Sequence, residues 1–182
     1  QSRPGAVIMI GAERASAPEQ LLDRALRAAA LDLAERLRAA GIEQVILAGP
    51  ELAWMPPGAG AHPDPDTGPF HFGGRLAELI ERHALSPAFY FGAGSAPLLP
   101  AAALAQALAV LDTAERAGAR LVVTNNLHSC DWLGLSQARD AATVIIRATR
   151  DNGLAWSLQE HATYRVQTAL APDSPAQLDL DT

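Results

Sequence analysis

The sequence predicts an α/β protein in which a mainly parallel sheet is covered by helices on both faces. Short apolar runs alternate with longer segments whose apolar residues recur every three or four positions. Strands that are apolar along their whole length are typical of parallel sheets that are buried on both faces. The chain has 182 residues, 49% of them hydrophobic, so we expect a single domain over residues 1–182.

The first quarter of the chain is expected to form two strands joined by a long helix. Residues 6–10 are an apolar run that ends at Gly11, and residues 45–48 form a second such run. Between them, Ser16 and Glu19 have the spacing of a capping box, and apolar residues then recur at helical spacing. Gly41 supplies the usual stop signal, so the helix should run from just after Ser16 to about residue 40.

The rest of the chain continues the alternation after one long interruption. Residues 56–74 are rich in Pro, Gly and Asp, which predicts a loop longer than most connections, and such loops are often functional. Beyond it we expect a short helix around 76–80, a strand at 89–91, a helix over 101–117, a strand at 121–123, a helix over 138–150 and a last strand at 164–168.

Composition excludes several classes of function. All fourteen basic residues are Arg, so no mechanism that needs a lysine amine has a residue to perform it. A net charge of -6 and a pI near 5.3 argue against nucleic acid as a partner. Cys130 is the only cysteine, and no apolar run is long enough to span a membrane, so we expect a cytoplasmic protein that has no membrane partner.

A polar cluster follows the predicted strand at 121–123. In parallel sheets ligands bind at the carboxyl ends of the strands, where this cluster should lie. Asn125 and Asn126 could hydrogen bond a base edge or a sugar, while His128 or Asp131 could handle a proton or a cation. The alternative is that the two asparagines only satisfy backbone groups of the loop.

Two further groups of residues lie in the long loop. His71 and Arg75 flank a pair of glycines at a predicted helix start, where exposed N–H groups could meet a phosphate or a base. The alternative for His71 is an ordinary surface histidine. Residues 62–66 resemble a metal cluster by residue type, but their prolines hold the segment extended, so we expect a solvated loop.

Residues 90–100, Tyr-Phe-Gly-Ala-Gly-Ser-Ala-Pro-Leu-Leu-Pro, resemble the strand and loop of molybdenum-cofactor guanylyltransferases and related nucleotidyltransferases of the GT-A class. Other pieces occur in the matching order: a first strand ending at Gly11, the long helix, the Gly-rich loop at 68–74, and Asp-Leu-Asp-Thr at 179–182. The resemblance covers nearly the whole chain and implies a nucleotide-diphospho-sugar transferase-like fold.

The resemblance also implies a site. Gly11 and Arg14 would hold nucleotide phosphates, Gly94 and Ser95 would lie in the nucleotide-binding loop, and Mg²⁺ would assist the reaction if the protein is active. The chain departs from the pattern because it lacks the usual Lys, carries an acidic Glu13 in the first loop, and has Ser95 where the metal-binding Asp falls. Asp131 or Asp181 would then have to supply the missing carboxylate.

Three functions follow as alternatives. The first is a nucleotidyltransferase-like protein that binds a nucleoside triphosphate or related metabolite and transfers a nucleotidyl group to a small phosphorylated or hydroxylated acceptor. The second is an inactive binding or interaction module of the same fold. The third is a serine hydrolase using Ser95, although Ala93 and Pro97 replace the glycines of a nucleophile elbow. The sequence does not indicate an oligomeric state.

Overall fold

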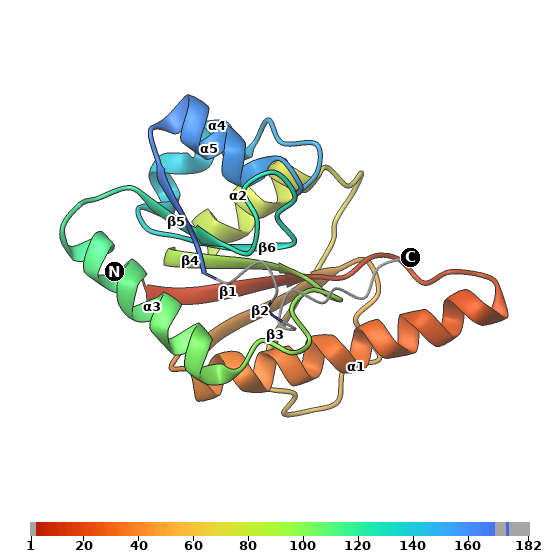
Figure 1. Cartoon of the computed structure of the whole chain (residues 1–182). Coiled ribbons are helices and arrows are strands. Elements are labelled where there is room, and N and C mark those ends of the chain that lie inside the picture. Colours follow the sequence, from red (N-terminus) through yellow and green to blue (C-terminus); the bar gives the residue numbers. More distant parts are fainter. Residues whose placement is uncertain (1–2, 170–173, 175–182) are drawn as a thin grey trace.

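The computed structural model describes residues 3–169 and 174 and contains one seven-stranded sheet, with the strand order β3-β2-β1-β4-β6-β5-β7 (Figure 1). The strands are β1 (Arg3–Met9), β2 (Gln44–Gly49), β3 (His62–Pro65), β4 (Leu85–Gly92), β5 (Leu121–Thr124), β6 (Trp132–Leu135) and β7 (Arg165–Thr168). The helices are α1 (Ala17–Ala39), α2 (Phe72–Arg82), α3 (Ala101–Arg116), η1 (Ala138–Ala141), α4 (Ala142–Ile145) and α5 (Leu154–Ala162). The predicted class, a mainly parallel α/β sheet with helices on both faces, is confirmed.

Six of the seven strands run in one direction. β1 lies parallel to β2 and to β4, with Val7 opposite Ile46 on one side and Tyr90 on the other. β3 continues the parallel set beyond β2, and β7 is parallel to β5. β6 is antiparallel to both of its neighbours, β4 and β5. The carboxyl ends of the other six strands therefore meet at one edge of the sheet.

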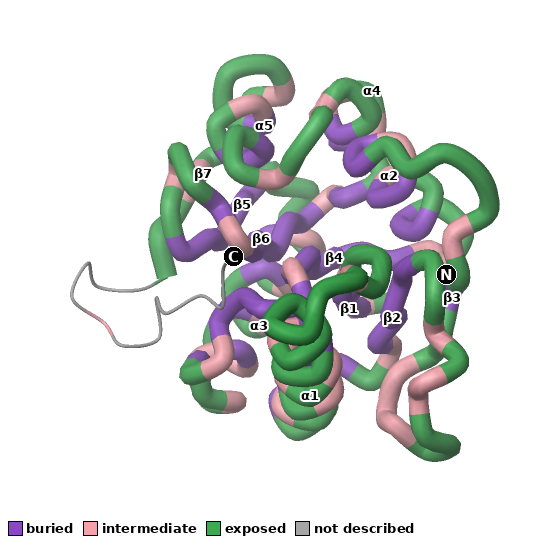
Figure 2. The backbone as a smooth tube through the Cα atoms, turned by 90° about the vertical axis from the view of Figure 1, so that its right-hand side faces the viewer, coloured by how far each residue is buried: buried purple, intermediate pink, exposed green. Residues whose placement is uncertain are grey.

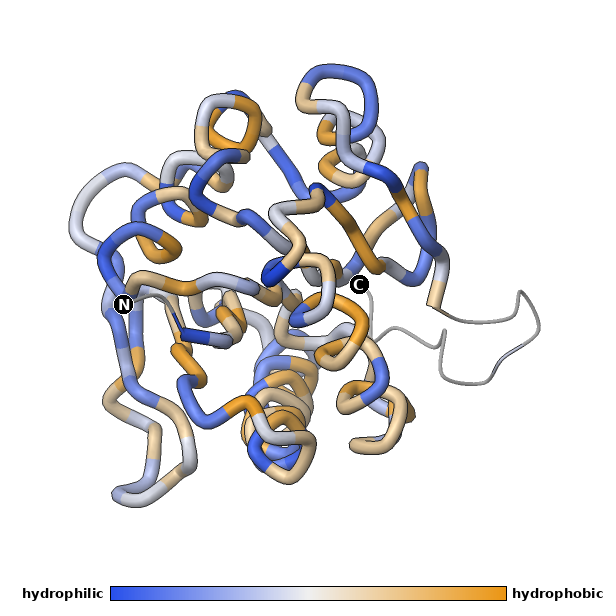
Figure 3. Tube along the Cα trace, turned by 90° about the vertical axis from the view of Figure 1, so that its left-hand side faces the viewer, coloured by the Kyte–Doolittle hydropathy of each residue, from blue (hydrophilic) through white to orange (hydrophobic). Residues whose placement is uncertain are grey.

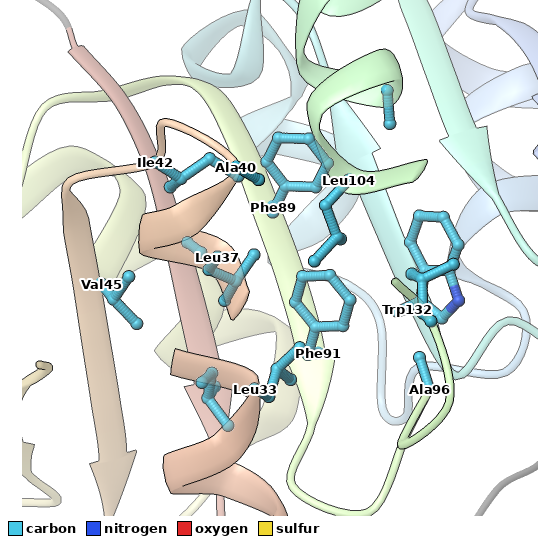
Figure 4. Packing of buried hydrophobic residues seen from close by; sticks show 14 of the residues in the cluster. Leu33, Leu37, Ala40, Ile42, Val45, Phe89, Phe91, Ala96, Leu104 and Trp132 are labelled. Atoms are coloured by element: carbon cyan, nitrogen blue, oxygen red, sulfur yellow. The ribbon is translucent and has the colours of Figure 1, made fainter. Parts of the chain in front are cut away.

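Helices cover the two faces in separate groups, as Figure 1 shows: α1 and α3 lie on one face, and α2, α4 and α5 on the other. On the first face, Leu33 and Leu37 of α1 and Leu104 of α3 pack around Phe89 and Phe91 of β4 (Figure 4). Figure 2 shows the central strands buried between these layers and the outer side of α1 exposed. Burying such side chains contributes about 1.5–3 kcal/mol each, which fixes the sheet as the frame of the molecule.

The long helix forms where the sequence places it. Ser16 precedes its first residue in an extended conformation, and the Ser16 N–H donates to the Glu19 carboxylate at 3.1 Å. Leu33 and Leu37 are fully buried, so the predicted apolar stripe is the face that packs on the sheet. Gly41 follows the helix with φ of 95°, a conformation that favours glycine.

The prediction that residues 56–74 form only a loop is wrong in its middle. Residues 62–65 form β3, which pairs through four positions with β2. Proline is tolerated there because β3 is an edge strand and needs its backbone groups on one side only. Helix α2 also begins earlier than expected, at Phe72.

The predicted helix over 138–150 is broken, and two elements were not anticipated. A 3₁₀ turn (η1) and the four-residue α4 take the place of the helix, because the consecutive β-branched residues 143–146 disfavour helical χ1 rotamers. The unanticipated elements are β6 and α5. Both are short. The sequence assigns the start of β6 to a polar loop, but in the structure Trp132 is buried, and its ring lies 5.5 Å from the ring of Phe91.

Hydrophilic residues gather on the outer loops and helix surfaces, as the hydropathy colouring of Figure 3 shows. None of the helices within residues 3–169 combines the length and the apolar character needed to cross a bilayer. All strands of this region join the same sheet. The extent of the domain, residues 1–182, stays a prediction.

Candidate functional site

A cleft of about 610 Å³ lies at the carboxyl edge of the sheet, between the ends of β1 and β2, the loop that leads into α2, and the segment after α4. Its walls are mostly apolar and aromatic, and these side chains are Met9, Ile10, Ala48, Phe70, Phe72 and Tyr90. Its polar side chains are those of Asp66, Thr149, Arg150 and Asp151. An apolar cleft of this size with a few polar groups is typical of a site for a small organic ligand.

One wall of the cleft is built on a buried tyrosine. The Tyr90 hydroxyl donates to Oδ2 of Asp151 at 2.7 Å, and the Phe72 ring meets the Tyr90 ring edge-on at 5.1 Å. Burial raises the pKa of Tyr90 well above its ordinary value, and the neighbouring Asp151 carboxylate raises it further. The phenol therefore stays protonated and holds the carboxylate in place.

The loop after β1 borders the cleft at one end and is tied to α1 at the other. Gly11 lines the cleft, whereas the Arg14 N–H donates to the Asp23 carboxylate at 2.7 Å. Glu13 forms an ion pair with Arg27 at 2.9 Å, so a helix cation offsets its charge. Of the two residues assigned here by sequence, the structure places Gly11 at the cleft and turns Arg14 toward α1.

His71 and Arg75 lie beside the cleft, around a smaller hollow of about 180 Å³. Nδ1 of His71 accepts the Gly74 N–H at 3.0 Å, which caps the start of α2. Arg75 is only 8% exposed, and its guanidinium donates to the carboxylates of Asp64, Asp66 and Glu78. These bonds give Arg75 a structural task, which competes with the phosphate contact expected for it.

Gly94 and Ser95 follow β4 and lie under the surface of the loop. The Ser95 side chain donates to the Gly92 carbonyl at 2.8 Å and is 3% exposed. Neither residue lines the cleft of about 610 Å³. A hydroxyl that is buried and bonded to a carbonyl lacks the access and the adjacent base that a nucleophile requires, so the geometry disfavours the hydrolase alternative.

The polar cluster after β5 closes on itself. Asn125 donates to the Asp131 carboxylate at 2.7 Å, and the Asp131 N–H donates back to the Asn125 side chain at 3.1 Å. Asn126 accepts the backbone N–H of His128 at 3.0 Å. Both Asn126 and His128 are at least partly exposed. Both asparagines are thus hydrogen bonded to groups of their own loop, and the imidazole of His128 lies at the surface.

The β5–β6 loop adjoins the cleft through the segment after α4. The Cys130 N–H donates to the Asn152 carbonyl at 3.1 Å, and the Cys130 thiol lies 3.1 Å from the carbonyl oxygen of Asp151. Burial raises the pKa of the Cys130 thiol to about 12, so it is a packed donor and not a reactive thiolate. Neither His128 nor Asp131 lines the cleft, and the contact of their loop with the cleft runs through Cys130.

The described residues do not assemble a metal site. Across residues 3–169 and 174, no three His, Cys, Asp or Glu side chains converge closely enough to hold an ion. Asp181, the second predicted carboxylate, lies outside the described residues. The donor set within the described part of the chain therefore does not fit the Mg²⁺ ion that the sequence resemblance implies.

Sequence reasoning missed several side chains of the cleft. Phe70 lies in the Gly-rich loop at 68–74 but was given no role, and Asp151 carries no motif. Thr149 and Arg150 were assigned to a helix that does not form as predicted. One signal was available, because a tyrosine inside a fully apolar strand needs a hydrogen-bond partner for its hydroxyl. That requirement pointed to a polar residue over β4, and the partner is Asp151.

Comparisons with known proteins agree on the fold. No protein-family profile and no curated protein matches the sequence, but 25 solved chains match the structure. A cytidylyltransferase from Leptospira borgpetersenii has a TM-score of 0.70 at 11% identity, covering 100% of this chain and 82% of its own. The 2-C-methyl-D-erythritol 4-phosphate cytidylyltransferase of Thermus thermophilus has a TM-score of 0.57 at 19% identity, with coverages of 96% and 92%.

A third similar structure is the Rv0371C protein of Mycobacterium tuberculosis in complex with manganese. Its TM-score is 0.57 at 18% identity, covering 100% of this chain and 95% of its own. At identities this low the likeness shows a shared fold. That fold is the nucleotide-diphospho-sugar transferase-like α/β architecture, as the sequence resemblance implied.

Proposed function

We propose that the cleft of about 610 Å³ binds a nucleotide and that the protein is nucleotidyltransferase-like. The observation that supports this most directly is the cleft itself, which is walled by Phe70, Phe72 and Tyr90 at the carboxyl edge of a parallel sheet. Flat aromatic and apolar walls suit a base, and strand ends are where such sheets bind ligands. The shared fold with two cytidylyltransferases supports the same reading.

The reaction that belongs to this proposal is transfer of a nucleotidyl group. An oxygen of a small phosphorylated or hydroxylated acceptor forms a bond to the α-phosphorus, and the bond from that phosphorus to pyrophosphate breaks. The proposed base for the acceptor hydroxyl is His128, an exposed residue of the β5–β6 loop. In the same loop the Asp131 carboxylate accepts a hydrogen bond from Asn125. No step is assigned to a metal, because the described residues do not form a site for one.

The nucleotide class is the finer part of the proposal. The sequence resemblance to molybdenum-cofactor guanylyltransferases favours guanine, whereas two structural neighbours are named as cytidylyltransferases. Binding to GTP and CTP, each with and without Mg²⁺ or Mn²⁺, separates these readings. A ligand at a hundred times its Kd stabilises the fold by about 2.7 kcal/mol, which a melting curve resolves.

A matched pair of variants ties the binding to the cleft. Ala12 and Ala15 are both exposed residues of the same loop, but only Ala12 lines the cleft. Ala12→Trp should fill the cleft and abolish the nucleotide-induced rise in Tm, while Ala15→Trp should leave it unchanged. Equal binding by both variants would place the ligand elsewhere and refute the proposed site.

An inactive binding module remains the second candidate, and specific contacts favour it. The two cations predicted to meet phosphate lie beside carboxylates of the chain itself: the Arg14 guanidinium is 3.9 Å from Asp23, and the Arg75 guanidinium is paired with Asp64 and Asp66. Pyrophosphate release separates the two candidates. Pyrophosphate release that requires the acceptor and is lost in His128→Ala supports nucleotidyl transfer. Nucleotide binding without pyrophosphate release, whichever divalent metal is added, supports the inactive binding module.

The serine hydrolase is tested independently. Ser95 is buried and bonded to the Gly92 carbonyl, so the protein should not react with a fluorophosphonate probe. Ser95→Ala should keep full nucleotide binding, because the residue does not line the cleft. Labelling of the wild type that disappears in Ser95→Ala would restore the hydrolase.

A further inference from the structure

Asp151 has one carboxylate oxygen that is available to a ligand in the cleft. Asp151 lines the cleft, and its Oδ2 accepts the Tyr90 hydroxyl at 2.7 Å. Among the hydrogen bonds of residues 3–169, Oδ1 of Asp151 accepts none. The other carboxylate of the cleft, Asp66, is already paired with the Arg75 guanidinium at 2.9 Å. Asp151 is therefore the anionic acceptor that a bound ligand meets.

The position of Asp151 is fixed from several sides. Tyr90 is 4% exposed, wedged edge-on against Phe72, and keeps its proton because burial raises its pKa. The backbone of Asp151 is also held, because its carbonyl oxygen accepts the Cys130 thiol and the Leu154 N–H, the latter at 2.7 Å. A carboxylate held this way cannot turn away from the cleft without breaking a buried hydrogen bond, and leaving such a group unpaired is costly.

We propose that Asp151 is a specificity-determining residue that selects bases carrying an exocyclic amino group. A carboxylate oxygen accepts hydrogen bonds and cannot donate them, so it stabilises an amino group and repels a keto oxygen at the same place. The surrounding walls are mostly apolar, which strengthens this discrimination because a mismatched group finds few other hydrogen-bond partners there. The inference rests on the proposed nucleotide binding and specifies the substrate class of that same cleft.

Matched nucleotide pairs test the selection directly. CMP and UMP differ in an amino or a keto group, as do AMP and IMP, and GMP differs from IMP by one amino group. Calorimetry on the wild type should show the amino member of at least one pair binding about tenfold tighter, the scale of one charge-assisted hydrogen bond. Equal affinity within all three pairs overturns the inference.

The Asp151→Asn variant should reverse the base preference. The asparagine carbonyl can still accept the Tyr90 hydroxyl, which leaves an amide NH₂ toward the cleft in place of the carboxylate oxygen. The variant should then bind UMP more tightly than CMP, and it should no longer bind AMP or GMP more tightly than IMP. Asp140→Asn is the control, because Asp140 is an exposed aspartate outside the cleft, and it should keep the wild-type order.

The outcomes separate this inference from the proposed function. If none of the five nucleotides binds the wild type, the proposed function fails and this inference fails with it. If they bind without discrimination, or if Asp151→Asn melts cooperatively and keeps the wild-type preference, nucleotide binding stands and the role of Asp151 is refuted. The role of Asp151 is also refuted if affinity depends on the ribose 2′-hydroxyl, as judged with deoxynucleotides, and not on the amino group of the base.

Discussion

The buried carboxylate of Asp64 should be the most sensitive charged position of the fold. Asp64 is 6% exposed and lies between three basic side chains, with the Arg75 guanidinium at 2.7 Å, Arg82 at 2.9 Å and the His83 ring at 2.7 Å. Through these contacts β3, the edge strand, is attached to α2. Asp64→Asn keeps the shape of this side chain and removes its charge.

The pKa of Asp64 gives the magnitude. Burial alone would raise this pKa, but hydrogen bonds from Arg75 and His83 and the Arg75 charge outweigh burial and lower it from 3.8 to about 2. At about 1.4 kcal/mol for each pKa unit, the ionised carboxylate stabilises the folded state by roughly 2 kcal/mol. Because the folded pKa is the lower one, this stabilisation is complete well above pH 3.8 and is lost as the pH falls toward 2. It should be about 1 kcal/mol at pH 3.

Urea denaturation between pH 7 and pH 3 measures this effect. At pH 7 Asp64→Asn should lose roughly 2 kcal/mol, or a Tm about 4–8 °C lower, and the gap to the wild type should narrow as the pH drops below 5. Asp32→Asn is the control, since Asp32 is exposed and its ion pair with Arg36 contributes at most about 0.5 kcal/mol. A gap that stays constant from pH 7 to pH 3 would refute the assignment of the stabilisation to the Asp64 charge.

Three other perturbations have defined outcomes. Gly73→Ala should destabilise the fold by about 3 kcal/mol, because a Cβ there would lie 1.9 Å from a carbonyl oxygen of α4, whereas Gly153→Ala faces open space and should be near neutral by thermal denaturation. Asn125→Ala should cost about 1–2 kcal/mol in urea and speed hydrogen exchange in the β5–β6 loop, because its bonds to Asp131 are lost. Arg150→Ala should weaken CMP binding about tenfold by calorimetry and leave cytidine binding unchanged, since Arg150 is an exposed cation lining the cleft.

Most of the layer structure could be predicted from the sequence because it depends on local signals. Fully apolar runs marked β1, β2, β4 and β5, and the Ser16 cap and Gly41 stop bounded α1 closely. The failures are at elements that tertiary contacts decide. β3 contains two prolines and is a strand only because β2 offers it an edge, and β6 is a strand only because it fills the space between β4 and β5.

The site was less predictable than the fold because most residues that belong to sequence motifs are not the residues that line the cleft. Gly11 was found at the cleft, since glycine after a first strand is a local signal. Arg14 and Arg75 were chosen for their charge. The sequence could not reveal that their guanidinium groups lie beside the carboxylates of Asp23 and Asp64, because those ion pairs form between separate parts of the chain. Asp151 was overlooked because its importance comes from Tyr90, 61 residues away.

The distribution of charge suggests how the cleft would orient a nucleotide. Arg75 compensates Asp66, which leaves Asp151 and Arg150 as the oppositely charged groups of the lining, adjacent in sequence. Asp151 is half-buried against Tyr90 and Arg150 is exposed, so the anionic acceptor lies deeper than the cation. A ligand that matches this order carries hydrogen-bond donors on an inner flat ring and negative charge on its outer end. A nucleotide with an amino-bearing base has both features, and an uncharged nucleoside would use only the inner half. The contrast between nucleoside and nucleotide binding in Arg150→Ala and Asp151→Asn therefore measures the two halves of the cleft separately.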